Sequence, residues 1–115
     1  MKLNLQAGKG VNPGQVMVAI DMGSNSFHMV LARLEGGEVR AVQKLAEKVM
    51  LAAGLDSKNQ LSDEAMERGL ACLRRFAQVA DNIDPHWIRC VGTNTLRRAH
   101  NGEKFLARVR EVLNC

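Results

Sequence analysis

Short apolar runs separated by polar turns occupy the first half of the chain. Residues 16–20 form a continuous apolar run, the pattern of a strand that is buried on both faces. A second strand is predicted over 27–34, with apolar side chains on both faces, and a longer, more polar strand over 39–51. Because only the short turns 22–26 and 35–38 join the three strands, they are expected to form an antiparallel meander.

The second half of the chain has the periodicity of helices around one further strand. After a loop, Ser62 is a suitable N-cap for a helix that runs to about Asp81, with apolar residues three and four positions apart. Residues 87–92 predict a fourth strand, and the intervening helix requires it to lie parallel to the sheet. Residues 93–100 then connect to a last helix capped by Asn101. The order β-β-β-α-β-α predicts an α/β fold, a mixed sheet with helices packed on it.

The composition fits one small folded domain. The chain has 115 residues, of which 46% are hydrophobic and 24% charged, which excludes wholesale disorder. No apolar run approaches the ~20 residues that a membrane-spanning helix needs. Residues 1–15, rich in glycine, are predicted to be a flexible lead-in to a domain over 16–115. The three isolated cysteines, Cys72, Cys90 and Cys115, indicate reduced thiols in the cytoplasm and no zinc or disulfide framework.

The positive charge is concentrated near the C-terminus. Sixteen basic against twelve acidic residues give a net charge of +4, and the part from residue 84 onward is the most basic. Such a region suits an anionic partner, and an exposed helix face explains it equally well. With three Phe, one Trp and no Tyr, base stacking has little support, so nucleic acid is not an expected partner.

The turn Asp21-Met22-Gly23-Ser24-Asn25-Ser26 is the first candidate for chemistry. A glycine lets the backbone approach an anion, successive N–H groups in a tight turn can bind it, and hydroxyls add donors. A carboxylate at the end of a strand can hold a hydrated divalent cation beside phosphate groups. The same residue types also build ordinary hairpin turns, so both interpretations stay open.

A second candidate follows the fourth strand, where Gly92-Thr93-Asn94-Thr95-Leu96-Arg97-Arg98 places hydroxyls and guanidiniums together. Ligands of α/β sheets gather at the carboxyl ends of parallel strands, and arginine suits phosphate contacts. An exposed transition from a loop to a helix explains the pattern as well. His28 lies on a predicted buried strand, and we expect it to be packed rather than catalytic.

Four segments together carry a resemblance to a known family. They are Ala19-Ile20-Asp21-Met22-Gly23-Ser24-Asn25-Ser26-Phe27-His28-Met29-Val30, Leu51-Ala52-Ala53-Gly54-Leu55, Leu61-Ser62-Asp63-Glu64-Ala65-Met66-Glu67-Arg68-Gly69-Leu70 and Val91-Gly92-Thr93-Asn94-Thr95-Leu96-Arg97-Arg98-Ala99-His100-Asn101. From about residue 16 to its end, the chain resembles exopolyphosphatases and guanosine-pentaphosphate phosphohydrolases. The resemblance implies the fold of actin, sugar kinases and the Hsp70 ATPase, in which two ribonuclease-H-like domains flank a cleft. This chain would form the first of them, incompletely.

The resemblance also implies an activity and a set of site residues. Members hydrolyse terminal phosphoanhydrides of inorganic polyphosphate, or the 5′ phosphate of guanosine pentaphosphate, with a divalent cation such as magnesium. Asp21 would act near the metal, through water, or near the attacking water. The phosphate-binding positions would be Gly23, Ser24, Asn25, Ser26 and Arg97. Arg98 has no counterpart in the family pattern, and the full-length parent is expected to be a homodimer.

The resemblance places two parts of the family's active site outside this chain. A catalytic glutamate and a second glycine-rich phosphate loop follow the position of Asn114-Cys115. Because a base that orients water and a two-sided clamp supply the rate, we expect an N-terminal portion of a phosphohydrolase that is inactive alone. A non-catalytic polyphosphate or polyanion-binding module is the alternative. A kinase or ATPase of the same fold is disfavoured by the Gly-Ser-Asn-Ser turn, and polyphosphate and guanosine pentaphosphate are not distinguished.

Overall fold

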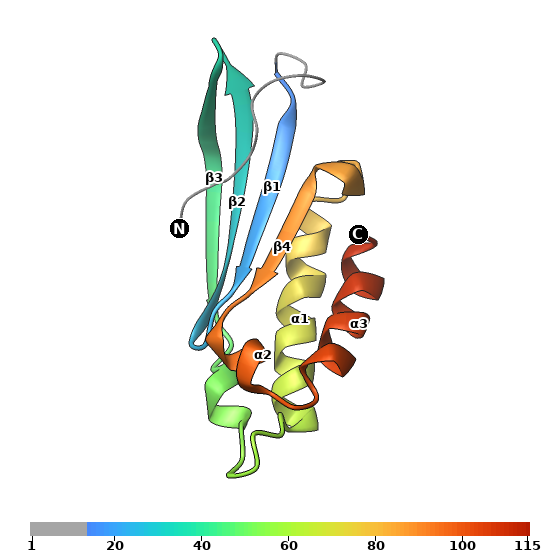
Figure 1. The fold of residues 1–115 in the computed structure, drawn as a ribbon. Helices are drawn as coiled ribbons and strands as arrows, with labels where there is room; N and C mark the ends of the chain where they lie inside the picture. Colours follow the sequence, from blue (N-terminus) through green and yellow to red (C-terminus); the bar gives the residue numbers. More distant parts are fainter. Residues whose placement is uncertain (1–13) are drawn as a thin grey trace.

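A four-stranded mixed sheet forms the centre of the computed structural model, which describes residues 14–115 (Figure 1). The strands are β1 (Val16–Met22), β2 (Ser26–Glu35), β3 (Glu38–Lys48) and β4 (Ile88–Gly92), in the spatial order β3-β2-β1-β4. β1 and β3 each pair antiparallel with β2, whereas β4 pairs parallel with β1. The predicted meander and the parallel fourth strand are thus confirmed.

The predicted lead-in over 1–15 falls mostly on residues 1–13, which lie outside the described part of the chain. Its last two residues continue the pairing of β1 with β2. The Gly14 N–H donates to the Leu34 carbonyl at 2.8 Å, and the Leu34 N–H donates to the Gln15 carbonyl at 3.1 Å. The ordered hairpin therefore begins before the first strand.

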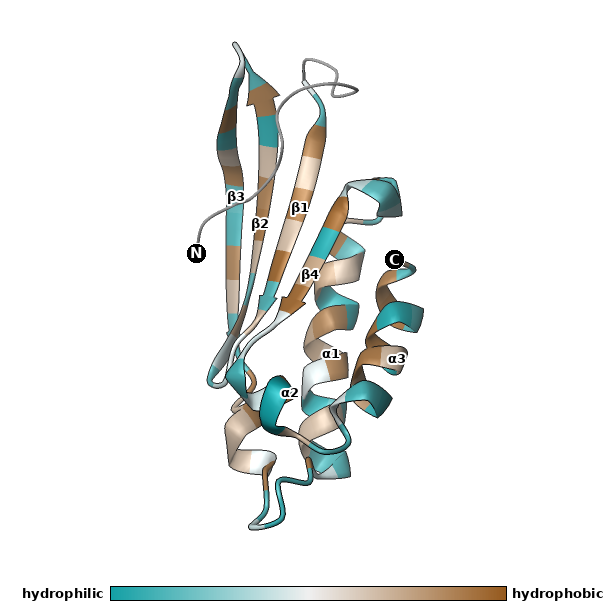
Figure 2. Cartoon of the chain, in the orientation of Figure 1, coloured by the Kyte–Doolittle hydropathy of each residue, from teal (hydrophilic) through white to brown (hydrophobic). Residues whose placement is uncertain are grey.

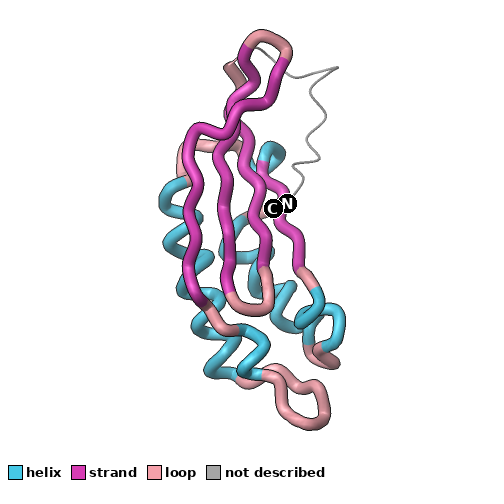
Figure 3. Tube along the Cα trace, turned by 90° about the vertical axis from the view of Figure 1, so that its left-hand side faces the viewer, coloured by secondary structure: helices cyan, strands magenta, loops and turns pink. Residues whose placement is uncertain are grey.

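The two longer helices, α1 (Asp63–Val79) and α3 (Gly102–Leu113), pack against the same face of the sheet. Figure 3 shows both behind the strands. The shorter elements are η1 (Leu51–Gly54), η2 (Pro85–Trp87) and α2 (Asn94–Arg98). Ser62 caps α1 as predicted, because its Oγ accepts a hydrogen bond from the Ala65 N–H at 3.1 Å. None of the helices in residues 14–115 combines the length and apolar character that crossing a membrane requires.

The third strand ends earlier than its apolar pattern predicts. β3 stops at Lys48, and residues 51–54 form a turn of 3-10 helix instead of continuing the strand. Met50 adopts a left-handed conformation with φ of 54°, which is incompatible with an extended strand. Figure 2 shows β3 as more hydrophilic than β1, in agreement with the predicted polar character of this edge strand.

The core lies between the sheet and the two long helices. Alternate residues of β1 and β2, among them Ile20, Met22, Phe27 and Met29, are at most 1% exposed. They pack against the apolar stripes of the helices, which include Leu70, Leu73, Phe105 and Val109. At Gly69 in α1, an added Cβ would lie 3.0 Å from the Phe105 ring, so the glycine lets this ring pack close to the α1 backbone. Burial of this apolar surface stabilises the fold.

The side chain of Asn101 does not cap the last helix, contrary to prediction. Asn101 occupies the N-cap position of α3 and makes no side-chain cap bond. Its amide instead pairs with the backbone of Leu61, accepting from the Leu61 N–H at 2.8 Å and donating to the Leu61 carbonyl at 2.9 Å. The amide thus bonds to Leu61 as the backbone of a neighbouring strand would. The two hydrogen bonds connect the loop before α1 to the start of α3.

Replacing Asn101 with alanine is expected to lower the free energy of unfolding by about 2–3 kcal/mol, because two partly buried backbone groups lose their partners. Asn101→Asp keeps the acceptor but sets a carboxylate oxygen against the Leu61 carbonyl, so it should cost at least as much. Urea denaturation measures both. If Asn101→Asp is as stable as the wild type, the hydrogen bond that the Asn101 amide donates to the Leu61 carbonyl does not contribute to stability.

Candidate functional site

The two candidate turns of the sequence lie together at one end of the sheet. β1 and β4 run parallel with Met22 beside Gly92, so the segments that follow them meet at their carboxyl ends (Figure 1). The Thr95 hydroxyl donates to the Ser24 hydroxyl at 2.7 Å. The N–H and the hydroxyl of Thr93 both donate to the Met22 carbonyl, at 3.2 and 3.1 Å. Residues distant in sequence therefore form a single site.

The turn between β1 and β2 requires a glycine at its first position. The Gly23 N–H donates to the Ser26 carbonyl at 3.1 Å. A Cβ at Gly23 would lie 2.7 Å from that same oxygen, which belongs to the backbone and cannot move aside. The turn is so tight that only glycine fits at this position. The turn places residues 24–26 at the edge of the sheet.

Two successive carbonyl groups of this turn are directed toward one neighbouring segment. The Ser24 carbonyl accepts from the Ala52 N–H at 3.0 Å. The Asn25 carbonyl accepts from the N–H groups of Val49 and Met50, at 3.0 and 2.8 Å. Because C=O and N–H point in opposite directions across a trans peptide, the N–H of Asn25 points away from that segment. Within residues 14–115 the N–H groups of Ser24 and Asn25 donate to no acceptor. Such a pair of free amides can bind an anion.

Asp21 adds an unpaired carboxylate oxygen to the site. Its Oδ1 is buried and has no hydrogen-bond partner among the described residues. A buried polar atom of this kind normally finds a partner, and a hydrated Mg²⁺ beside a phosphate would supply one. No three His, Cys, Asp or Glu side chains gather around one point in residues 14–115. This donor set fits Mg²⁺, which takes one or two carboxylates and completes its shell with water and substrate phosphates.

His28 is exposed, contrary to the prediction that it is packed. Phe27 and Met29 on either side of it are buried against the helices, so His28 points to the opposite face of the sheet. It is the cross-strand partner of Asp21, which places an imidazole next to the unpaired carboxylate. The alternation of apolar Phe27, polar His28 and apolar Met29 indicates an exposed histidine. The prediction missed it because apolar residues surround His28 along the chain.

Lys48, which the sequence did not single out, lies at the same end of the sheet. It is the β3 partner of Ser26 and is exposed. Its ammonium group therefore adds positive charge beside the turn. Only the strand register reveals this position, because Lys48 and Ser26 are far apart along the chain.

Arg97 lies on α2, next to this site but not in contact with the turn. Its guanidinium donates to the Asn94 side chain at 3.2 Å, and no hydrogen bond joins it to residues 23–26 within the described part of the chain. The exposed side chain lines a hollow of about 320 Å³ together with Gly92, His100 and Glu103. The structure thus brings Asp21, Gly23, Ser24, Asn25 and Ser26 together. Arg97 lies beside them, at the rim of the candidate site, without contacting the turn.

The two buried or partly buried cysteines, Cys72 and Cys90, contribute no nucleophile to the site. Burial, with a smaller contribution from the charges of Cys115 and Asp21, raises the pKa of the Cys90 thiol to about 12. Burial is also the main cause that raises the pKa of the Cys72 thiol to about 12. Both thiols stay protonated at neutral pH, when only a thiolate would attack or bind a metal.

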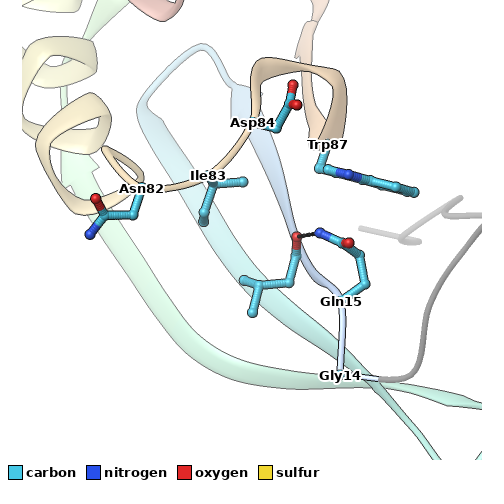
Figure 4. A pocket seen from close by; sticks show the side chains of 7 residues that line it. Gly14, Gln15, Asn82, Ile83, Asp84 and Trp87 are labelled. Atoms are coloured by element: carbon cyan, nitrogen blue, oxygen red, sulfur yellow. Dashed lines mark hydrogen bonds between the residues drawn. The ribbon is translucent and has the colours of Figure 1, made fainter.

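A hollow of about 700 Å³ at the other end of β1 is a poor alternative site (Figure 4). Gln15 lines it, with its side chain donating to the Val16 carbonyl, and so does Trp87. Its one carboxylate, Asp84, accepts from the His86 N–H at 2.9 Å and thereby caps η2. Since the hollow lies at the amino end of β1, it is not where open α/β sheets bind ligands.

Comparison with known proteins identifies similar chains. The model of the Ppx/GppA phosphatase family matches residues 29–115. A Ppx/GppA family member from Aquifex aeolicus has a crystal structure that superposes with a TM-score of 0.79 at 22% sequence identity, over 88% of this chain and 33% of that one. An exopolyphosphatase from Cytophaga hutchinsonii has a TM-score of 0.79 at 25% identity, over 87% and 32%. The chain thus spans about a third of the length of these solved structures.

Proposed function

Because the chain belongs to the Ppx/GppA phosphatase family, we propose that it forms the first phosphate-binding wall of a phosphohydrolase. The substrate would be the terminal phosphoanhydride of inorganic polyphosphate or the 5′ phosphate of guanosine pentaphosphate. The predicted actin-like, ribonuclease-H-like fold is confirmed by the solved members of the family that superpose on it. The activity and the substrate remain the proposal.

The observation that carries this proposal is the juxtaposition of free amides and an unpaired carboxylate. The N–H groups of Ser24 and Asn25 and the hydroxyls nearby supply donors for phosphate oxygens. Asp21 presents its unpaired oxygen at the end of the strand that leads into the same turn. Donors and a carboxylate so close together suit a phosphate and its cation, whereas a purely structural turn needs neither.

Each group has a distinct role in the proposed site. The free amides and the Ser24 and Ser26 hydroxyls would bind a terminal phosphate, and Arg97 would swing from the rim to contact the next phosphate. Asp21 would hold Mg²⁺ through a water molecule. Magnesium, when bound, neutralises charge on the phosphate oxygens.

We further propose that this chain binds its substrate without hydrolysing it. The sheet neighbours of Asp21 are His28 and Val91, so no second carboxylate flanks it within the sheet. A general base distinct from the metal-holding carboxylate would have to come from elsewhere in a complete enzyme. The same observation favours the alternative of a polyanion-binding module, which differs from a phosphohydrolase part only in having no catalytic partner.

Titration of the 115-residue chain with sodium tripolyphosphate, with and without MgCl₂, tests the proposal. We expect saturable binding that Arg97→Met weakens about tenfold or more, because a charge-assisted contact to phosphate is lost. Arg98→Met is the matched control, since it removes the same charge one residue further along and should leave the affinity within about twofold.

Three results would contradict the proposal. The absence of saturable binding would remove the phosphate site, and an equal loss in both arginine variants would indicate unspecific attraction of an anion by a basic surface. Release of phosphate by the wild-type chain above an Asp21→Ala control would show that it is catalytic alone. The affinities for tripolyphosphate and guanosine pentaphosphate, measured side by side, would indicate the preferred substrate.

The proposal extends to location and assembly. All three cysteines are free, and two of them are buried or partly buried, which suits a reducing compartment such as the cytoplasm. A homodimeric full-length parent stays a prediction. Its test is the mass in solution of the longer protein.

A further inference from the structure

We propose that Arg68 is a positioning residue that orients the phosphate-binding amides of the β1–β2 turn through residues 49–52. This inference rests on the proposed function. We name residues 49–52 the backing segment, because they lie behind the turn. Arg68 belongs to α1 and does not touch the turn itself, so its effect would pass through the backing segment.

The guanidinium of Arg68 binds two successive carbonyl groups of the backing segment. Its Nε donates to the Val49 carbonyl at 2.9 Å, and its Nη2 donates to the Met50 carbonyl at 3.0 Å. The remaining Nη1 lies 3.4 Å from the Glu64 carboxylate, one turn earlier on α1. All three nitrogens of the side chain thus have a partner, and the group is fixed between the helix and the backing segment.

The backing segment in turn binds the carbonyl groups of the turn. The N–H groups of Val49 and Met50 donate to the Asn25 carbonyl, and that of Ala52 donates to the Ser24 carbonyl. These bonds set the rotation of the two peptide planes. Because each peptide is planar and trans, the N–H groups that share these two planes, those of Asn25 and Ser26, then face away from the backing segment. Loss of the backing segment would free these peptides to rotate, and the anion site would no longer be preorganised.

Arginine suits this role for a geometric reason. Successive carbonyls point to opposite sides in a strand, and they point the same way when the residue between them has helical dihedral angles. Met50 has φ of 54° and ψ of 48°, so the Val49 and Met50 carbonyls come within reach of one fork. A non-glycine residue in this conformation is disfavoured by itself and needs its surroundings to hold it. A lysine would present a single point of charge in place of the fork.

The contacts of Arg68 differ from those of an ordinary exposed arginine. The Arg68 side chain is 39% exposed, and an exposed arginine usually forms ion pairs or remains in water. Here two of its donors are committed to backbone oxygens of the backing segment, whose Val49 and Leu51 side chains are buried in the same core as α1. Arg75, two helical turns further along the same helix, shows the ordinary case, because within residues 14–115 it pairs with the Glu47 side chain on β3.

The test compares Arg68→Met with Arg75→Met in the full 115-residue chain. Both changes remove one guanidinium from α1 and one ion pair, and only the first releases the backing segment. We expect Arg68→Met to weaken tripolyphosphate binding about tenfold or more and to shift and broaden the amide resonances of Asn25 and Ser26. Arg75→Met should leave the affinity within twofold and those resonances unchanged. Arg68→Lys should lie between the wild type and Arg68→Met, because one carbonyl can still be bound.

The outcomes separate this inference from the proposed function. If the wild type binds no tripolyphosphate, the proposed function fails for this chain, while the amide resonances of the two methionine variants still decide the role of Arg68. Unchanged resonances of Asn25 and Ser26 in Arg68→Met would overturn the inference, as would equal effects of the two variants. If Arg68→Met does not fold, both measurements are made on Arg68→Lys. A tripolyphosphate affinity and amide resonances equal to those of the wild type would then overturn the inference.

Discussion

Replacing Gly54 with alanine is expected to lower the free energy of unfolding by about 3 kcal/mol, at the upper end of what overpacking costs. A Cβ on Gly54 would lie 2.2 Å from the Cβ of Ala65 and 3.2 Å from the Ser62 hydroxyl. Neither neighbour can move easily. Ala65 is fully buried in the first turn of α1, and the Ser62 N–H donates to the Gly54 carbonyl at 2.9 Å.

A double-mutant cycle distinguishes this collision from a general weakness of the loop. Ala65→Gly alone should cost about 1 kcal/mol, the usual penalty of glycine in a helix. In the double variant Gly54→Ala with Ala65→Gly, the colliding atom is gone, so the total cost should be smaller than the sum of the two single changes by about 1 kcal/mol or more. Urea denaturation of the four proteins measures the coupling. If the losses in free energy of unfolding are additive, the contact with Ala65 is not the reason that position 54 requires glycine.

Replacing Asp21 with asparagine is expected to raise the free energy of unfolding by up to about 1 kcal/mol while abolishing the effect of Mg²⁺ on tripolyphosphate binding. The Oδ1 of Asp21 is buried without a partner, and an ionised group in that situation costs stability. Asparagine has the same shape and no charge. It can no longer attract a hydrated cation, so the affinity with MgCl₂ present should fall about tenfold or more.

Asp56→Asn is the matched control for this substitution. The Asp56 carboxylate accepts from the N–H groups of Lys58 and Gln60, at 2.8 and 2.9 Å, and takes no part in the site. Its replacement should reduce stability slightly and leave the binding of tripolyphosphate unchanged. Opposite signs of the two stability effects would support a functional carboxylate at position 21. A clear loss of stability in Asp21→Asn would instead indicate that this carboxylate holds the fold together.

Most of the fold could be predicted because local patterns encode it. The apolar run of β1, the alternation in β2 and the glycine pair before β3 predicted a meander that the structure confirms. Ser62 was predicted correctly as the cap of α1, since a cap depends on the next few residues only. The polar turn after β1 was likewise recognisable, because its glycine and serines suit the local geometry of a tight turn.

The errors arose where a side chain has a choice of distant partners. Asn101 has the residue type of a helix cap, and it pairs instead with Leu61, forty positions earlier. His28 has apolar neighbours along the chain, and the direction of its side chain followed from which face of the sheet the helices cover. Local propensity offers several equivalent bonds to such residues, and packing selects one.

Periodicity and turn chemistry therefore determined the elements, their order and the two polar turns, because each depends on residues within a few positions of one another. Only the tertiary structure decided that these two turns lie side by side. The parallel pairing of β4 with β1 brings Thr95 to Ser24, 71 positions apart along the chain. It also decided that Arg68 holds the backing segment and that the Asp21 oxygen stays unpaired. Contacts between residues so far apart depend on how the elements pack together, which no local pattern contains.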